Sequence, residues 1–304
     1  DSIPATILLA VVYFFNVNKK VVAAILFVAA VLFKPQSGLL APVVLVQFYR
    51  DFFNFRNINL GIVKKNLKNT IFAAVGGIST YIVLVFPFYY HTEFYSKHVD
   101  ANTPFLKTFL VETMDYFYWL FNLYRISIDD YPYATANAFN FWVLAGAQTV
   151  VDSDIFIMFS YAKWGFIISI PAFLLTLAYL VIKRNSVKAL YFSSFFILAA
   201  FFTFFTRMHE RYLLPSIIFL TVCILWDKWL WIPLAIISTC VTANHWYIYY
   251  REMNNIDVWI PNYDRVAMPF SFLTVMTVLF SVVYMIWLMK KQKKPLDNTG
   301  GQIS

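Results

Sequence analysis

The stretch FFTFFTRMHERYLLP (residues 201–215) places ionisable side chains inside an otherwise apolar run: Arg207, His209, Glu210 and Arg211. Charge at membrane depth is costly and is usually kept for a function. A guanidinium fork suits phosphate oxygens, and a histidine can donate a hydrogen bond to a phosphate or titrate. The pattern therefore predicts a phosphate-binding site in which Glu210 holds one arginine in place. The alternative is that charges at a helix end simply reach into headgroup water.

Two further polar interruptions have residues that suit the same site. In LFKPQSGLLAP, Lys34 ends one apolar run, Pro35 breaks the helix and Gln36 can both donate and accept hydrogen bonds. In NYDRVAMPF, Asp264 and Arg265 precede the last apolar run. We expect Lys34 and Arg265 to bind the phosphate, with Gln36 and Asp264 in supporting roles. Interfacial anchoring is the other explanation for Lys34, and a helix cap is the other explanation for Asp264.

The stretch TANAFNFWVLAG (residues 135–146) is a candidate sugar or acceptor site. Asn137 and Asn140 lie about one helical turn apart, with Trp142 nearby. Amides and an aromatic face suit a sugar, but they also suit a re-entrant loop that satisfies its own backbone. Asp1 precedes an apolar run and is a candidate general base.

The composition defines the class of protein that must position these residues. The chain has 304 residues, of which 61% are hydrophobic and 13% are charged. A soluble domain carries about 25% charged residues, so the sequence predicts an integral membrane protein. The net charge of +8 then bears on topology and does not indicate a nucleic-acid partner. Both cysteines lie in apolar runs and the other histidines are dispersed, so we expect no metal site and no cofactor.

Apolar segments dominate the chain and predict an all-α, polytopic transmembrane protein with about nine spans. The segments are 1–16, 20–33, 35–49, 70–90, 155–182, 189–206, 211–226, 229–249 and 266–289. A full span needs about 20 residues, so the second and third segments are short enough to be tilted spans or the arms of a bent hairpin. The sequence opens within an apolar pattern, which favours a chain truncated at its N-terminus.

Lys and Arg are unevenly divided between the two sides that alternating spans would create. Fifteen of the 24 basic residues, but only three of the 16 acids, lie on the side that holds loops 17–19, 50–69, 183–188, 227–228 and 290–304. The positive-inside rule makes that side cytoplasmic. All the polar clusters described above then lie on the outer face, and residues 1–290 form one transmembrane domain. Residues 291–304 form a basic cytoplasmic tail that we expect to be disordered.

The long outer loop, about residues 91–154, is too long to lack structure of its own. Its stretch FLKTFLVETMDYFYWLFNLYR (residues 105–125) is amphipathic, with Thr108, Glu112, Asp115 and Asn122 near one helical face. We therefore expect an interfacial helix in this loop.

Four motifs together, DSIPATILLAVVYFF, LFKPQSGLLAPVVL, NAFNFWVLAG and FTRMHERYLLP, resemble one known group. The chain is similar to the bacterial mannosyltransferase-related branch of the GT-C glycosyltransferases, which resembles the second GPI-anchor mannosyltransferase. The resemblance spans residues 1 to about 290. It implies an inner-membrane, multi-pass enzyme with an extracytoplasmic active site, a polyprenyl-phosphate sugar donor and inverting transfer. GT-C enzymes carry a catalytic Asp in the first outer loop, and nothing here matches that loop, so the general base is expected upstream of this chain.

The expected function is transfer of mannose or another hexose to a glycan, lipid or protein acceptor. The expected partners are membrane lipids, the lipid-linked donor and that acceptor, with no nucleic acid. Two other classes stay open. A secondary transporter would place charges and broken helices near the midplane in paired repeats. A non-catalytic protein that handles polyprenyl lipids would use the same phosphate site without a base.

Overall fold

A computed structural model describes residues 2–53, 58–100, 102–129 and 131–291. The candidate base Asp1 and the tail 292–304 lie outside the described residues. The chain is 75% helix and 4% strand, so the expectation of an all-α protein is confirmed apart from one short hairpin.

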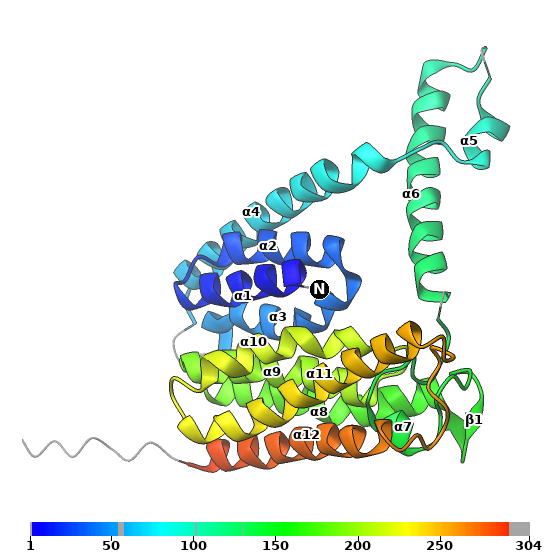
Figure 1. The fold of residues 1–304 in the computed structure, drawn as a ribbon. Helices are drawn as coiled ribbons and strands as arrows, with labels where there is room; N and C mark the ends of the chain where they lie inside the picture. Colours follow the sequence, from blue (N-terminus) through cyan, green and yellow to red (C-terminus); the bar gives the residue numbers. More distant parts are fainter. Residues whose placement is uncertain (1, 54–57, 101, 130, 292–304) are drawn as a thin grey trace, which may run out of the picture.

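The helices follow one another along most of the chain (Figure 1). The α-helices are α1 (Ser2–Asn16), α2 (Lys20–Phe33), α3 (Ala41–Phe48), α4 (Leu60–Val85), α5 (Glu93–His98), α6 (Phe105–Asp129), α7 (Phe141–Leu144), α8 (Tyr161–Ile182), α9 (Val187–Phe204), α10 (Leu214–Cys223), α11 (Trp231–Met253) and α12 (Ala267–Lys290). The 3-10 helices are η1 (Pro35–Leu40), η2 (Arg50–Phe53), η4 (Phe86–Phe88), η5 (Glu210–Leu213) and η6 (Lys228–Leu230).

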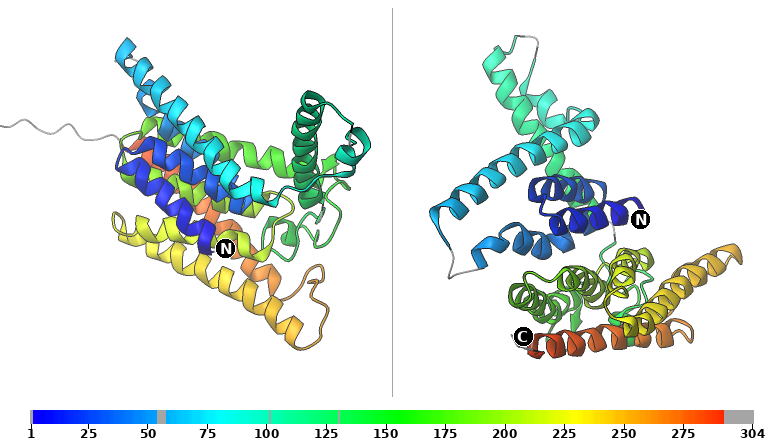
Figure 2. Two further views of the ribbon diagram at one scale, coloured as in Figure 1. Left: turned by 90° about the horizontal axis from the view of Figure 1, so that it is seen from above. Right: turned by 90° about the vertical axis from the view of Figure 1, so that its left-hand side faces the viewer.

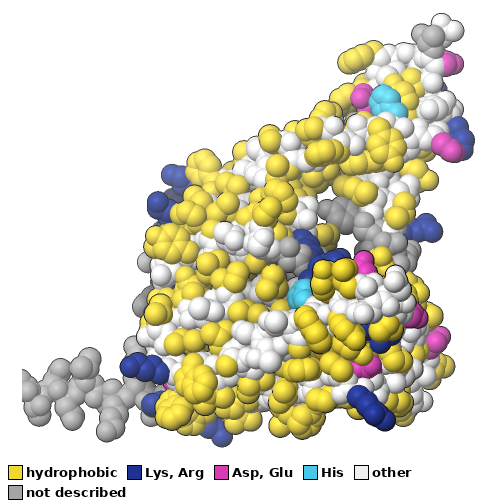
Figure 3. Space-filling view, in the orientation of Figure 1, with side chains coloured by type: hydrophobic (Ala, Val, Ile, Leu, Met, Phe, Trp, Pro, Cys, Tyr) yellow, Lys and Arg dark blue, Asp and Glu magenta, His cyan; other side chains and the backbone are white. Residues whose placement is uncertain are grey.

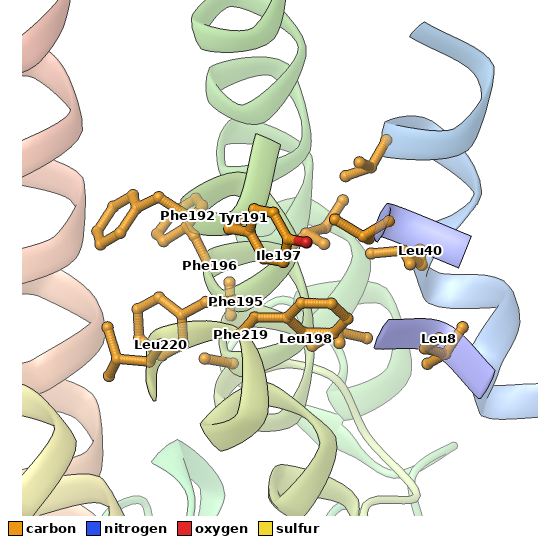
Figure 4. Packing of buried hydrophobic residues seen from close by; sticks show 14 of the residues in the cluster. Leu8, Leu40, Tyr191, Phe192, Phe195, Phe196, Ile197, Leu198, Phe219 and Leu220 are labelled. Atoms are coloured by element: carbon orange, nitrogen blue, oxygen red, sulfur yellow. The ribbon is translucent and has the colours of Figure 1, made fainter. Parts of the chain in front are cut away.

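Helix α9 is the centre of the helical body. It packs against α8, α10 and α12, and the N-terminal helices α1 to α3 lie between these helices and α4 (Figures 1 and 2). Phe192, Phe195 and Phe196 of α9 are fully buried and fill the space between neighbouring helices (Figure 4). The chain has only eight glycines, and aromatic rings fill much of the space between the helices.

Helices α4 and α6 extend beyond this body and form an arch (Figures 1 and 2). The first part of α4 packs against α2, its far end leaves the body, and α6 returns toward the body. The helix expected at residues 105–125 is therefore present as α6 and runs to Asp129.

The count of nine full-length spans is not confirmed. Among the described residues, helices long and apolar enough to cross a membrane cover Leu60–Phe88, Tyr161–Ile182, Val187–Phe204 and Ala267–Lys290. Helix α1 has 15 residues and would be about 22 Å long, short of the roughly 30 Å hydrocarbon core. Helix α11 has 23 residues but carries His245, Arg251 and Glu252. The four apolar helices support a membrane protein.

Two predicted boundaries need correction, and each has a local cause. Helix α4 begins at Leu60, ten residues before the predicted span, because the Asn59 side chain accepts a hydrogen bond from the Ile62 amide at 3.0 Å. The apolar residues from 155 to 160 do not begin a span. They form the hairpin β1 (Ile155–Phe156) and β2 (Phe159–Ser160), and α8 begins only after it.

Basic side chains gather at one end of the body, at the left in Figure 3. There the Lys20 ammonium lies 2.9 Å from a carboxylate oxygen of Asp51. Lys188 likewise lies 3.3 Å from Asp227 and donates a 2.7 Å hydrogen bond to the Tyr284 hydroxyl. The connections that the Lys/Arg pattern assigned to one side therefore contact one another. The connections 131–160, 205–213 and 254–266 lie at the opposite end.

Candidate functional site

The candidate site begins where α9 ends, at the end of the body opposite the basic side chains. The chain leaves α9 at Phe204 and passes through Arg207, whose φ of 61° is uncommon for a residue other than glycine. Two backbone hydrogen bonds fix this connection to the loop of residues 131–140. The Arg207 amide donates to the Tyr133 carbonyl at 2.9 Å, and the Ala136 amide donates to the Met208 carbonyl at 3.0 Å. The segment that leads into η5 is thereby held in one conformation.

Arg207 forms a bidentate ion pair that its sequence neighbourhood does not show. Its Nε lies 2.7 Å from Oδ2 of Asp152, and its Nη2 lies 3.2 Å from Oδ1. The Thr206 hydroxyl adds a 3.3 Å hydrogen bond to the same carboxylate, which is buried. Asp152 therefore holds Arg207, whereas the sequence analysis assigned the holding of an arginine to Glu210. The charge of Arg207 is largely balanced before any ligand arrives.

Lys34 and η5 meet around one aromatic ring. The Lys34 ammonium lies 4.5 Å from the ring centroid of Tyr212, and the guanidinium carbon of Arg211 lies 6.0 Å from it. Lys34 reaches this position because α2 stops before it and Pro35 starts η1 from an extended Lys34 backbone. Glu210 contacts Arg211 at 3.5 Å. The structure thus brings Lys34 to Glu210 and Arg211, which are neighbours in sequence but far from Lys34 along the chain.

This group, Lys34, Glu210, Arg211 and Tyr212, holds two basic side chains and one carboxylate and is called the cation cluster below. Burial, together with the charge of Arg211, lowers the pKa of Lys34 to about 8, and Glu210 opposes the change. Two basic side chains next to one carboxylate favour the approach of an anion. Because the Arg211 side chain is 51% exposed, such an anion can reach it from outside.

His209 lies at the edge of the cation cluster. Its ring packs edge-on against Tyr131, with 4.8 Å between centroids, and against Tyr212, with 5.2 Å between centroids. Its Nδ1 lies 4.0 Å from a carboxylate oxygen of Glu210. His209 is mostly buried and is positioned by aromatic rings, so its orientation is fixed by packing.

Gln36 borders a narrow cavity behind the cation cluster. The cavity walls include Leu8, Lys34, Gln36, Leu198, Phe202 and Tyr212. The Gln36 Oε1 atom is buried and has no hydrogen-bond partner among the described residues. The cavity volume is about 30 Å³, which is close to the share of one water molecule. A phosphate group would therefore bind on the exposed side of the cluster, next to Arg211, and not in this cavity.

The Asn137 side chain is used within the protein. Its Nδ2 donates to the Val258 carbonyl at 3.1 Å. Its Oδ1 accepts hydrogen bonds from the Ile260 amide at 3.1 Å and from the Gln148 side chain at 3.2 Å. Asn137 therefore joins its own loop to residues 258–260 through both ends of its side-chain amide.

Asn140 and Trp142 are fully buried. The Asn140 Oδ1 accepts from the Trp142 amide at 3.0 Å and caps α7, and its Nδ2 donates to the Phe202 carbonyl at 3.3 Å. The Trp142 indole donates to the Phe204 carbonyl at 3.0 Å. They thus satisfy backbone groups of their own loop and of the end of α9, as buried polar groups must, which is the alternative that the sequence left open. The assignment of Asn137, Asn140 and Trp142 to a sugar or acceptor site stays a prediction.

Asp264 caps the last helix. Its Oδ1 accepts hydrogen bonds from the Val266 amide at 2.8 Å and the Ala267 amide at 2.9 Å, and its Oδ2 accepts one from the Tyr247 hydroxyl at 2.7 Å. Arg265 is exposed on the same turn. No contact in the described part of the chain joins Arg265 to the cation cluster. Asp264 and Arg265 therefore lie at the same end of the helical body as the cation cluster but are not part of it.

Two contributors to the site were missed by the sequence analysis. Asp152 pairs with a residue 55 positions away, and no local pattern indicates such a pair. Tyr212 lies inside the quoted motif, and its place directly after Arg211 was the signal available. Within the described ranges, no three His, Cys, Asp or Glu side chains gather as metal ligands would. No protein-family model, curated protein or solved structure matches the chain.

Proposed function

We propose that the chain is an integral membrane glycosyltransferase. It would transfer mannose or another hexose from a polyprenyl-phosphate donor to an extracytoplasmic acceptor with inversion. The observation that carries this proposal is the cation cluster, in which Lys34 and Arg211 meet at one end of an apolar helical body. A lipid-linked phosphate has the matching chemistry, because its charge needs cations while its chain needs apolar surroundings.

The chemistry requires stabilisation of a phosphate leaving group. Negative charge builds up on the phosphate as the bond to the sugar breaks, and cations placed beforehand bind that charge more strongly in the transition state. Arg211 and Lys34 would supply this stabilisation, with His209 donating a hydrogen bond. Arg207 contributes indirectly, because its ion pair with Asp152 fixes the segment that presents the cluster. An acceptor hydroxyl must also lose a proton, and Asp1 is the candidate base within this sequence.

The proposed orientation follows from the division of charge between the two ends. The end that holds Lys20, Lys188 and Lys290 would face the cytoplasm, and the end that holds the cation cluster would face outward. The same charge division supports placement in the cell (inner) membrane. Donor and acceptor would then meet at the outer surface.

A non-catalytic protein that binds polyprenyl lipids is the second candidate. Within the described residues, Glu210 is the one carboxylate of the cation cluster, and it already contacts Arg211. Such a protein would bind the lipid phosphate but transfer no sugar, so activity separates the two candidates.

Sugar transfer by the full-length protein in lipid nanodiscs tests the proposal. With a polyprenyl-phosphate hexose as donor, Arg211→Lys should slow transfer by about 10- to 100-fold. The lost fork bond is worth about 1.5–3 kcal/mol, and about 1.4 kcal/mol is tenfold in rate. Arg184→Lys, at the opposite end of the helices, is the matched control and should keep the wild-type rate. Donor binding without transfer would favour the lipid-binding protein, and wild-type transfer by Arg211→Lys would contradict the proposal.

A further inference from the structure

A second cavity lies in the arch, between α5 and the C-terminal half of α6. Its volume is about 640 Å³, within the range of small-molecule sites. Its walls include Tyr90, His91, Phe94, Tyr118, Trp119 and Asn122. None of these residues belongs to the cation cluster.

Asp115 fixes the frame of this cavity. It is fully buried on α6 and accepts hydrogen bonds from the Tyr89 hydroxyl at 2.7 Å and from the Thr92 amide at 3.0 Å. The Thr92 hydroxyl donates to the same carboxylate and also accepts from the Phe94 amide at 3.1 Å, which caps α5. These hydrogen bonds join residues 89–94, on one side of the cavity, to α6 on the other side.

Several aromatic rings line the cavity. Trp119 is 6% exposed and packs edge-on against Tyr90, with 6.0 Å between ring centroids. Phe94 lies 5.9 Å from Tyr118, which is 49% exposed. The cavity therefore presents flat apolar faces, and the rings of Tyr90 and Tyr118 are open to the surroundings.

The polar groups at the rim include one ion pair and one amide. Glu93 and Lys97 form the ion pair at 3.3 Å, and His91 lies 3.7 Å from a carboxylate oxygen of Glu112. The Asn122 amide makes no side-chain hydrogen bond within the described residues and borders the cavity. The Lys97 ammonium, the one Lys or Arg side chain among the described residues of the cavity wall, is therefore already paired with Glu93. A purely apolar ligand would leave the Asn122 amide without a partner.

We propose that this cavity binds a neutral saccharide. A pyranose ring has an apolar face that stacks on Tyr118 and Trp119, and hydroxyl groups that bond to Asn122 and the rim. The assignment of this saccharide to the acceptor rests on the transferase function proposed above. The binding of a saccharide to the cavity does not depend on that function. The acceptor class would then be a glycan or a glycosylated lipid.

The cavity is connected to the cation cluster through α6. Asn122 lies seven residues before the end of this helix at Asp129, which is about 10 Å along the helix axis. Tyr131, two positions beyond Asp129, meets the ring of His209 with 4.8 Å between ring centroids. A saccharide held in the cavity can therefore extend along α6 toward the cluster.

The test measures saccharide binding without any donor, by saturation-transfer difference NMR on the full-length protein in nanodiscs. The probes are methyl α-mannoside, methyl β-glucoside and a mannose disaccharide. Tyr118→Ala and Asn122→Leu should each weaken binding by about five- to tenfold, through loss of the stacking face and of the amide. Tyr118→Phe keeps the ring and should bind like the wild type. Phe117→Ala is the matched control, since Phe117 is an exposed aromatic residue on α6 that does not line the cavity.

Binding that follows this pattern supports the saccharide site even if no sugar transfer is found. No saccharide binding by the wild type would overturn it, as would equal binding by all the variants. Uptake of a short alkyl glycoside through its alkyl chain alone, with no signal from the sugar protons, would also overturn it.

Discussion

Raising the pH from 7 to 9 should weaken binding of a polyprenyl phosphodiester, because Lys34 loses its proton over this range. Burial, together with the charge of Arg211, places the pKa of Lys34 at about 8. The ammonium is therefore mostly charged at pH 7 and mostly neutral at pH 9. The contribution of its charge to phosphate binding is present below pH 8 and is lost as the pH rises through 8.

The size of the effect follows from this pKa. A bound phosphate favours the charged amine, so the pKa of Lys34 in the complex lies above 8. Between the two pKa values, affinity falls about tenfold per pH unit, which gives a loss of about tenfold between pH 7 and pH 9. The phosphodiester stays singly charged throughout. Tyr212 stays neutral because burial raises its pKa, although the nearby Arg211 acts in the opposite direction.

The assay is equilibrium binding of a polyprenyl-phosphate hexose to the full-length protein in nanodiscs at pH 7, 8 and 9. Lys34→Arg is the informative control, since a guanidinium stays charged over the whole range and should remove the pH dependence. If the wild type binds equally well at pH 7 and pH 9, or if Lys34→Arg keeps the wild-type slope, Lys34 does not contact the phosphate.

Three other predictions concern the ion pair, the arch and the topology. Asp152→Asn should destabilise the protein by about 1.5–3 kcal/mol, measured by thermal unfolding in detergent, because it removes charge-assisted bonds to Arg207; an unchanged midpoint would contradict this. Burial would raise the pKa of Asp115, but hydrogen bonds from Thr92 outweigh this effect and hold the pKa below its usual value. The ionised carboxylate therefore stabilises the arch above about pH 4, and this stabilisation is lost as the pH falls through the pKa of Asp115 in the folded protein. The protection factor of the Thr92 amide, which is the intrinsic exchange rate divided by the observed rate at the same pH, should therefore fall on acidification in the wild type but change little in Asp115→Asn. A protection factor in the wild type that does not change with pH would refute this. A cysteine at Lys64 should escape an impermeant thiol reagent in intact cells, and its labelling would reverse the proposed orientation.

Helices were predictable here because each apolar run had to become a helix to satisfy its backbone in lipid. Their ends were less predictable. Three lysines after Leu60 look like a loop by charge, but the Asn59 cap starts α4 before them. The residues after Ile155 look like a span by hydropathy, but their backbone pairs across a hairpin. Local capping and pairing decide such boundaries, and composition does not record them.

The candidate site was predictable only where residues lie at the same end of several helices. Alternating helix directions indicate that Lys34 and Arg211 share an end, and the structure adds the Tyr212 ring between them. The partner of Arg207 was not predictable, because its pairing with Asp152 depends on how two loops cross. For a related reason the sequence left two roles open for Asn137: an amide in a loop has the same sequence signature whether it binds a sugar or a carbonyl.

Binding of polyprenyl phosphate to the cation cluster is the central claim, and one titration tests it most directly. Native mass spectrometry of the full-length protein in nanodiscs would compare the wild type, Arg211→Gln and Arg184→Gln at pH 7. Arg211→Gln removes the exposed cation of the cluster and should weaken lipid binding at least about tenfold, whereas Arg184→Gln lies at the other end of the helices and should bind like the wild type. Equal affinity of Arg211→Gln and the wild type would contradict the account.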